Sequence, residues 1–275
     1  MSRIFIDSLE DPRVRMYRDL KRSNLLRDGK QFIAEGIKLV ERLLASDYRV
    51  GSVLVSERRA EEWAEQIPDG VPLYVVPQQL GEQLTGFNFH VGVLACGYRK
   101  PPLSLDDLLP KSEQPTVAPS LTLAICPNCD NPENLGTIVR IGAAFGIDGL
   151  LLSREGCCDP FSRRVLRVSM GAAFQLPIIE SPDLTQDVQR LRDEWQFELI
   201  ASVLDESAEP LSRAARVDRV GILFGNEADG LDEHWRGLCS RHVTIPMSGG
   251  TDSLNVAIAA GIFLHHFTMS ASTAR

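Results

Sequence analysis

Side chains that could do chemistry gather in three short stretches of this 275-residue chain. They are Asn134 and Arg140 in NPENLGTIVR, Glu227 in ILFGNEADG, and Ser253 and Asn255 just after the loop MSGGTD. An arginine flanked by small residues leaves room for a phosphate or a second backbone, and a carboxylate at a strand end can bond a hydroxyl or offset a cation. Each residue also has a purely local explanation, because arginines lie on solvated helix faces and acids, serines and asparagines stabilise first helical turns.

The last of these stretches reads as a short strand, a loop and a long apolar helix. We expect the helix to run from Ser253 to Met269, with Asp252 or Ser253 as its N-cap. Because it is apolar nearly all round, one face of a sheet cannot cover it, and a subunit interface would cover the rest. The helix of the first stretch would begin at Asn134, which is placed to cap it, and would carry Arg140 off its buried face.

The composition is that of an ordinary globular protein, with 44% hydrophobic and 24% charged residues. No apolar run reaches the roughly 18 residues that a membrane helix needs, and the amino terminus lacks a signal-peptide core, so we expect a cytoplasmic protein without membrane association. The six cysteines are too few for a disulfide scaffold. Cys126 and Cys129 with Cys157 and Cys158 lack the paired spacing of a zinc site, so no metal is expected.

Two domains joined by a proline-rich linker are expected. Strands alternate with helices in residues 1–96, which predicts a small α/β domain, and residues 97–120 contain five prolines with little periodicity. The alternation resumes in residues 121–275 with longer apolar strands, which predict a Rossmann-like parallel sheet covered on both faces and binding ligands beyond the carboxyl ends of its strands. These strands are expected near residues 121–126, 149–152, 175–179, 197–203, 220–224 and 242–245.

The net charge of −8 argues against indiscriminate binding to nucleic acid, but the basic residues are clustered. One group lies in an expected basic helix over residues 13–29, and a second lies in the other half of the chain. Such patches favour a structured polyanion that is read at defined points, although solvated helix faces would explain them equally well. The candidate phosphate contacts are Arg13, Arg15, Arg18, Lys21, Arg163, Arg164 and Arg167.

In this order on one α/β domain, the three stretches resemble the three motifs of the knotted RNA ribose 2′-O-methyltransferases, the SpoU/TrmH family of the SPOUT superfamily. The matching residues are Asn134-Leu135-Gly136 with Arg140, Leu223-Phe224-Gly225-Asn226-Glu227 with Gly230-Leu231, and Ile245-Pro246-Met247 with Ser253-Leu254-Asn255-Val256. The resemblance covers about residues 121–269, including the segment DPFSRRVLRVSMG between motifs one and two. The amino-terminal domain resembles the L30-like substrate-binding domain of some members. Asn131, where aspartate is common, and Ala257, where serine is frequent, depart from the pattern.

The resemblance implies a deep trefoil knot, a homodimer formed through the carboxyl-terminal domain, and methyl transfer from S-adenosyl-L-methionine to a ribose 2′-hydroxyl of a structured RNA, rRNA or tRNA. It implies that Arg140 reaches in from the partner subunit. An arginine is too basic to accept a proton near neutral pH, so Arg140 would orient the hydroxyl and stabilise the alkoxide, with an RNA phosphate helping to remove the proton. Asn134, Glu227, Ser253 and Asn255 would order the ribose and Arg140. The cofactor would be held by Ser202, Val203, Phe224, Gly225, Asn226, Ile245, Met247 and Leu254.

The alternative is a catalytically inactive RNA-binding or ribosome-assembly protein with the same fold. Binding of S-adenosylmethionine would separate the two, because a protein that only binds RNA has no need of it. A nucleotide-binding dehydrogenase is disfavoured, because no G-x-G-x-x-G follows the first strand of either domain. Nothing in the sequence selects the RNA or the nucleotide that would be methylated.

Overall fold

The computed structural model describes residues 3–20, 29–109, 120–227, 229–248 and 253–272. It divides into two compact units, Met1–Pro101 with Phe161–Phe174, and Pro102–Pro160 with Gln175–Arg275. The sequence interpretation assigned residues 161–174 to the carboxyl-terminal domain, whereas in the structure they pack within the first unit. No helix within the described ranges is long and apolar enough to cross a membrane.

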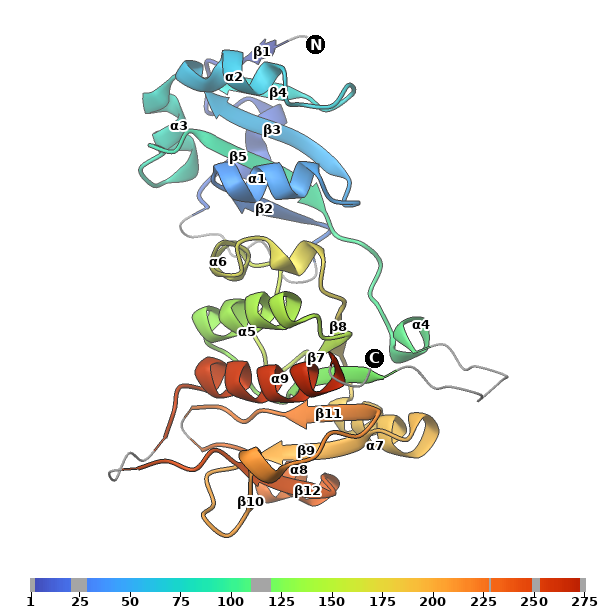
Figure 1. Ribbon diagram of the computed structural model, residues 1–275. Coiled ribbons are helices and arrows are strands. Elements are labelled where there is room, and N and C mark those ends of the chain that lie inside the picture. The colour runs from blue at the N-terminus through green and yellow to red at the C-terminus, as the bar shows by residue number, and fades with distance from the viewer. Residues whose placement is uncertain (1–2, 21–28, 110–119, 228, 249–252, 273–275) are drawn as a thin grey trace. The chain divides into compact units, whose positions relative to one another are not determined.

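The first unit is built on a mixed five-stranded sheet in the order β1-β4-β3-β5-β2 (Figure 1). β1 and β3 run parallel to β4, whereas β5 runs antiparallel to β2 and β3. The strands are β1 (Arg3–Phe5), β2 (Gln31–Glu35), β3 (Val50–Ser56), β4 (Leu73–Val76) and β5 (Val93–Tyr98). The helices are η1 (Pro12–Tyr17), α1 (Ile37–Leu44), η2 (Glu57–Arg59), α2 (Ala60–Ala64), α3 (Gln78–Thr85), α6 (Arg163–Val168) and η3 (Ala172–Phe174).

Both faces of the first sheet are packed. Adjacent residues of a strand point to opposite faces, so Phe32 and Ile33 of β2 enter different cores. Ile33 belongs to the core that η1 and α3 cover. On the other face the ring of Phe32 packs against the rings of Phe161 and Phe174, with centroids 5.4 and 5.6 Å away. The segment 161–174 therefore completes the core of this unit.

The prediction of a basic helix over residues 13–29 is wrong for the part of that range that the structure describes. A 3-10 helix over Pro12–Tyr17 forms instead, and its cap is Asp11, whose side chain accepts a hydrogen bond from the Arg13 N–H. The backbone at Arg18 is extended, and Asp19 has a φ of 51°, which ends the helix. The rest of the expected helix, with Lys21, lies outside the described residues.

The second unit contains a seven-stranded sheet in the order β10-β12-β9-β11-β6-β7-β8, and every neighbouring pair is parallel. The strands are β6 (Leu121–Cys126), β7 (Gly149–Ser153), β8 (Ile178–Ser181), β9 (Glu198–Ser202), β10 (Glu209–Pro210), β11 (Arg219–Leu223) and β12 (Arg241–Thr244). The helices are α4 (Leu105–Leu108), α5 (Pro132–Phe145), α7 (Leu184–Trp195), η4 (Leu211–Arg213), α8 (Glu233–Leu238) and α9 (Val256–Ser272). The expected parallel sheet is confirmed.

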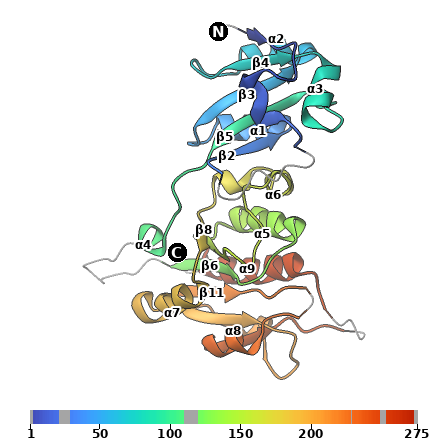
Figure 2. The same ribbon diagram turned by 180° about the vertical axis from the view of Figure 1, so that it is seen from behind.

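Helices cover both faces of this sheet, as its continuously apolar strands require. Figures 1 and 2 show α5 and α9 on one face and α7 with α8 on the other. Part of the expected linker also belongs here, because Ser104 and Asp107 form a capping box that starts α4. The indole N–H of Trp195 donates to the Leu109 carbonyl oxygen at 2.8 Å, which attaches this segment to α7.

Candidate active site

Two helix starts in the second unit differ from the sequence expectation. Helix α5 begins at Pro132, and its cap is Asn131, whose Oδ1 accepts from the Glu133 N–H at 2.9 Å. Proline suits the first helical position because it has no N–H to satisfy. Asn134 therefore lies inside the first turn, where it is buried and not used as a cap.

Helix α9 begins at Val256, and the expected cap at Asp252 or Ser253 is wrong. Ser253 precedes the helix without capping it, and Asp252 lies outside the described residues. The cap is Asn255, whose Oδ1 accepts from the N–H groups of Ala257 at 3.0 Å and Ile258 at 3.3 Å. Capping uses only the oxygen of the Asn255 amide, so its NH₂ group remains available.

The amide NH₂ group of Asn255 connects the three motifs by hydrogen bonds. Its Nδ2 donates to Oδ1 of Asn134 at 2.9 Å and to Oε1 of Glu227. Asn134 comes from the helix after β6, Glu227 from the loop after β11, and Asn255 from the start of α9. The structure therefore brings three of the expected catalytic residues into one hydrogen-bonded cluster at the carboxyl ends of two neighbouring strands.

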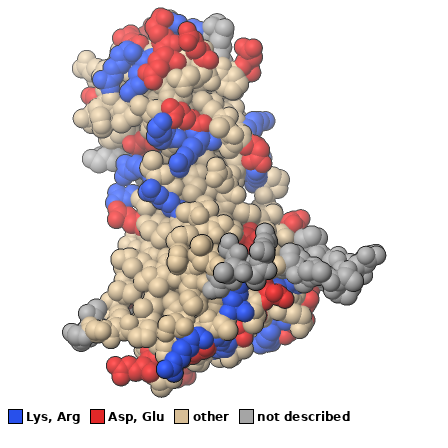
Figure 3. All heavy atoms as spheres, in the orientation of Figure 1, with Lys and Arg blue, Asp and Glu red and all other residues tan. Residues whose placement is uncertain are grey.

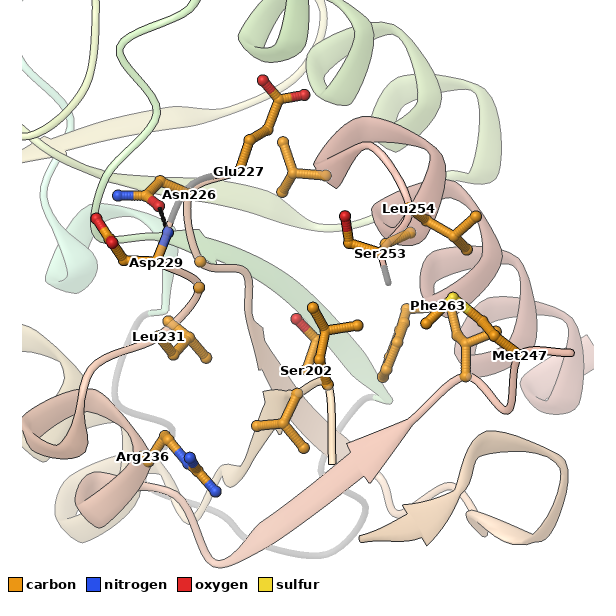
Figure 4. A pocket seen from close by; sticks show the side chains of 17 residues that line it. Ser202, Asn226, Glu227, Asp229, Leu231, Arg236, Met247, Ser253, Leu254 and Phe263 are labelled. Atoms are coloured by element: carbon orange, nitrogen blue, oxygen red, sulfur yellow. Dashed lines mark hydrogen bonds between the residues drawn. The ribbon is translucent and has the colours of Figure 1, made fainter. Parts of the chain in front are cut away.

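A cavity of about 250 Å³, which we call the large cavity, lies beside this cluster. It is bounded by the loops after β9, β11 and β12 and by the start of α9, and Figure 4 shows the side chains that surround it, with the carboxylate of Glu227 directed away from its centre. Of the expected cofactor residues, those that line it are Ser202, Val203, Gly225, Asn226, Ile245, Met247 and Leu254, together with the expected catalytic residues Glu227 and Ser253.

Phe224 is the expected cofactor residue that does not line the large cavity. Its side chain is fully buried and packs edge-on against Phe263, whose ring does line the cavity, with centroids 5.9 Å apart. Phe224 thus supports the cavity floor. Three further lining residues, Gly230, Leu231 and Val256, were matched as motif residues but not expected to hold the cofactor. The sequence analysis did not single out the remaining lining residues as site residues, because nothing in their type or spacing marks them: Leu204, Asp229, Arg236, Ala259 and Phe263.

The loop after β11 is held by a tight turn. The Asn226 side chain accepts from the Asp229 N–H at 2.7 Å, and Gly230 has a φ of 68°, a conformation that glycine adopts without strain. A Cβ atom at Gly225 would overlap the backbone of Gly230 and Leu231. Glycine at position 225 therefore lets the two sides of the turn touch and fixes where Glu227 leaves it.

A second cavity of about 210 Å³, which we call the small cavity, adjoins the large cavity at Glu227. It shares Asn226, Glu227 and Val256 with the large cavity. Its remaining residues belong to the loop after β6 and the start of α5, namely Asn128, Cys129, Asp130, Asn131 and Asn134.

Arg140 lines neither cavity of its own chain. It lies on α5 with its side chain exposed, and it makes no hydrogen bond or ion pair with any residue that the structure describes. The neighbouring surface is apolar, because Ile258 and Ile262 of α9 are 55% and 40% exposed. Figure 3 shows few charged side chains over α5 and α9.

The expected phosphate contacts that the structure describes lie in the first unit, including those from α6. Several are paired with acids: Arg13 with Asp11, Arg18 with Glu10, and both Arg163 and Arg167 with Glu35, at 3.2 and 3.7 Å. Burial lowers the pKa of Arg163, and its guanidinium stacks on the Phe87 ring at 4.5 Å. Arg15 and Arg164 are exposed.

The cysteines near the small cavity are buried thiols. Cys129 and Cys157 form an isolated backbone bridge, and the Cys157 thiol donates to the Cys126 carbonyl oxygen at 3.1 Å. Burial raises the pKa of both Cys126 and Cys129. In the part of the chain that the structure describes, no group of three or more His, Cys, Asp or Glu side chains is arranged to hold a metal ion.

Known proteins resemble this chain over nearly its whole length. “Uncharacterized tRNA/rRNA methyltransferase Rv0881” of Mycobacterium tuberculosis is 33% identical over 269 residues, 95% of this chain and 90% of that protein. The 23S rRNA (guanosine-2′-O-)-methyltransferase RlmB of Acinetobacter baylyi is 30% identical over 241 residues, 84% of this chain and 94% of RlmB. The AdoMet-bound rRNA methyltransferase structure from Sinorhizobium meliloti has a TM-score of 0.77 at 27% identity, covering 95% of this chain and 96% of that one.

Family matches agree with these similarities. Residues 11–95 match the MRM3-like substrate binding domain, and residues 122–265 match the SpoU rRNA Methylase family. The second match contains all three motifs and both cavities' lining residues. The fold, the three motifs that meet at one site and these matches all agree. The chain belongs to the SpoU rRNA Methylase family.

Proposed function

We propose that this protein transfers a methyl group from S-adenosylmethionine to a ribose 2′-hydroxyl of rRNA or tRNA. The observation that carries the proposal is the Asn255 amide, which donates to both Asn134 and Glu227 where two cavities adjoin. A site for methyl transfer needs a donor on one side, an acceptor on the other, and polar groups between them that order the acceptor hydroxyl. The relatives named RNA methyltransferases, and the AdoMet-bound structure, support the same reaction.

The large cavity fits S-adenosylmethionine. Leu231, Leu254 and Phe263 offer apolar contacts to a flat adenine ring, and the loop backbones offer donors and acceptors for its edges. Glu227 and Asp229 are acids that suit a sulfonium or an ammonium group. The residues that would hold the cofactor are Ser202, Val203, Gly225, Asn226, Ile245, Met247 and Leu254, supported from below by Phe224.

S-adenosylmethionine supplies an electrophilic methyl group whose bond to sulfur breaks as the bond to the ribose oxygen forms, leaving S-adenosylhomocysteine. The protein's part is to place the hydroxyl in line with that methyl group. Glu227 accepts a hydrogen bond from the hydroxyl. Asn255 holds Glu227 in place by donating to it, and Asn134 orients Asn255 by accepting from the same amide nitrogen. Arg140 stabilises the developing alkoxide, since a guanidinium donates but does not accept protons near neutral pH. The proton leaves to an RNA phosphate or to water.

Arg140 comes from a second copy of the chain in this proposal. It is exposed on α5 and lines neither cavity of its own chain. The exposed Ile258, Ile262 and Met269 of α9 give that surface the apolar character of a homodimer interface. We also propose that the second unit contains the deep trefoil knot that the family resemblance implies. The proposed location is the cytoplasm, where rRNA and tRNA are found.

The first unit binds the RNA substrate. Its match to a substrate binding domain supports this role, and Arg15 and Arg164 are exposed cations on it. Cations that contact phosphates hold an RNA without reading its sequence. Arg13, Arg18, Arg163 and Arg167 would exchange an acid partner for a phosphate, and Lys21 lies outside the described residues.

The test separates cofactor binding from transfer. Calorimetry measures binding of S-adenosylmethionine, and incorporation of labelled methyl groups into RNA from a deletion strain measures transfer. Arg140→Ala is expected to bind the cofactor like the wild type and to lose transfer by orders of magnitude. Arg213→Ala, at an exposed arginine in the same unit, should retain both. A wild-type protein that binds no S-adenosylmethionine would instead be an RNA-binding protein without this activity.

A further inference from the structure

We infer that the small cavity receives the base of the target nucleotide and that Asp130 selects guanine. The inference rests on the proposed function, because it concerns the substrate of the same site. It adds the identity of the base and the residue of this chain that reads it.

The small cavity lies where the connections of the sheet diverge. β6 leads through α5 to β7 on one side, whereas its neighbour β11 leads through α8 to β12 on the other. Loops that leave two neighbouring parallel strands in opposite directions open a crevice, which is the usual place for a ligand in such sheets. The cavity is lined from both loops, by Asn128, Asp130 and Asn131 after β6 and by Asn226 and Glu227 after β11.

The position of the small cavity makes it the nucleotide side of the site. It adjoins the large cavity, because Asn226, Glu227 and Val256 line both. With the methyl donor in the large cavity, the ribose hydroxyl has to meet the methyl group where the two cavities adjoin. A base attached to that ribose then extends into the small cavity, toward the loop that carries Asp130.

Hydrogen bonds within the protein decide what the small cavity offers a ligand. Oδ1 of Asn131 already accepts from the Glu133 N–H, and Oδ1 of Asn134 accepts from Asn255. These two side chains therefore have their amide NH₂ groups left to offer. Asp130 is exposed, and it makes no hydrogen bond or ion pair with any residue in the described ranges. The cavity thus presents a carboxylate acceptor beside amide donors.

Guanine is the RNA base that complements this set. Its N1–H and N2–H₂ groups donate side by side and match the two oxygens of one carboxylate, while O6 and N7 accept from amide NH₂ groups. Adenine and cytosine place a ring-nitrogen acceptor where guanine has N1–H, and a carboxylate repels it. Uracil offers a single N3–H between two carbonyl oxygens. Reading this edge requires an unpaired guanosine or one turned out of its helix.

The experiment uses purified full-length protein and RNA from a deletion strain. Mass spectrometry of the methylated RNA identifies the modified nucleoside, and transfer kinetics compare the wild type with Asp130→Asn and Glu155→Gln. Glu155 is an exposed acid of the same unit outside both cavities, so its variant controls for loss of one charge. We expect 2′-O-methylguanosine, and a fall in kcat/KM of roughly 10- to 100-fold for Asp130→Asn, the usual worth of one bidentate base contact. Calorimetry should show unchanged S-adenosylmethionine binding in both variants.

Saturation-transfer NMR tests base recognition without transfer. With S-adenosylhomocysteine at saturation, the wild type should contact GMP in preference to AMP, CMP and UMP, and Asp130→Asn should lose the preference. A methylated pyrimidine or adenosine, a fully active Asp130→Asn protein, or equal contacts from all four nucleotides would overturn the inference and leave 2′-O-methylation standing. A wild-type protein that binds no S-adenosylmethionine would overturn both the inference and the proposed function.

Discussion

Asn255 donates a hydrogen bond from Nδ2 to Oδ1 of Asn134 at 2.9 Å, although the two residues are 121 positions apart in the chain. The same amide nitrogen donates to Glu227, and the amide oxygen caps α9 through the Ala257 N–H. One side chain therefore joins three loops and also starts a helix. Its two roles use different atoms, so substitutions can separate them.

Asn255→Ser keeps an oxygen that can cap α9 and removes the amide donor. We expect a melting temperature close to that of the wild type, because serine caps helices about as well as asparagine. Transfer should fall by at least roughly 10-fold, because Glu227 and Asn134 lose the group that orders them. Asn255→Ala should lose transfer equally and also cost about 1 kcal/mol of stability. Transfer that falls only in step with stability would show that Asn255 is merely a cap.

Mixed dimers test whether Arg140 acts across the subunit boundary. Arg140→Ala and Asn255→Ala homodimers should each be inactive, but a heterodimer of the two has one site with both residues intact. Random exchange of equal amounts should restore about one quarter of wild-type transfer, since half of the dimers are mixed and each has one working site of two. The rate is measured after co-refolding or co-expression. No recovery would place Arg140 in its own subunit's site.

Gly225→Ala should abolish binding of S-adenosylmethionine. A Cβ atom at this position overlaps the backbone of Gly230 and Leu231, which cannot move without opening the turn that carries Glu227. Gly237→Ala is the matched control, because a Cβ atom there meets nothing within 4 Å, and it should stabilise the protein by about 0.5 kcal/mol. Calorimetry and thermal unfolding measure the two effects. Normal cofactor affinity in Gly225→Ala would show that the turn does not shape the cavity.

Ile258→Asp should produce monomers. The side chain is 55% exposed on α9, and a carboxylate there would be desolvated without a partner in an apolar interface. Val217→Asp, at a residue 39% exposed outside α9, controls for the gain of a charge on the second unit. Sedimentation velocity should show a dimer for the control and the wild type. A dimeric Ile258→Asp protein would place the interface elsewhere.

Alkaline pH should destabilise the fold through its buried thiols. Burial raises the pKa of Cys96 to about 11 and that of Cys239 to about 12, from an ordinary value of 9.0. The native state therefore holds these protons more tightly than the unfolded chain, so their stabilisation is complete below pH 9 and is lost as the pH rises toward 11 to 12. In that range each thiol should lower the free energy of unfolding by about 1.4 kcal/mol per pH unit.

Urea unfolding at a series of pH values measures this loss. Cys239→Ala should flatten the decline above pH 9, because one of the shifted groups is gone. An unfolding free energy that stays constant to pH 10.5 would contradict the prediction, as would a Cys239→Ala profile identical to that of the wild type.

Local patterns in the sequence determined much of the second unit. Continuous apolar runs such as LTLAI and GILF predicted parallel strands covered on both faces, because burial on both sides leaves no polar alternation. Asn134, Glu227 and Asn255 each follow an expected strand, which predicted that they lie at one edge of that sheet, since the carboxyl ends of parallel strands lie together. Residue type and spacing carry this information, so no knowledge of the chain path was needed.

Only the tertiary structure decided which atoms meet. The N-cap of α9 is Asn255 and not Asp252 or Ser253. The oxygen of the Asn255 amide accepts from the helix, and its nitrogen donates to Asn134 and Glu227. Residues 161–174 joined the first unit because Phe161 and Phe174 bury against Phe32, a contact between positions far apart in the chain. The residues that line both cavities likewise come from separate segments, Asn226 and Glu227 from the loop after β11 and Val256 from the start of α9. The type of a residue determines which hydrogen bonds and apolar contacts it can make, whereas the tertiary path of the chain determines which residues it makes them with.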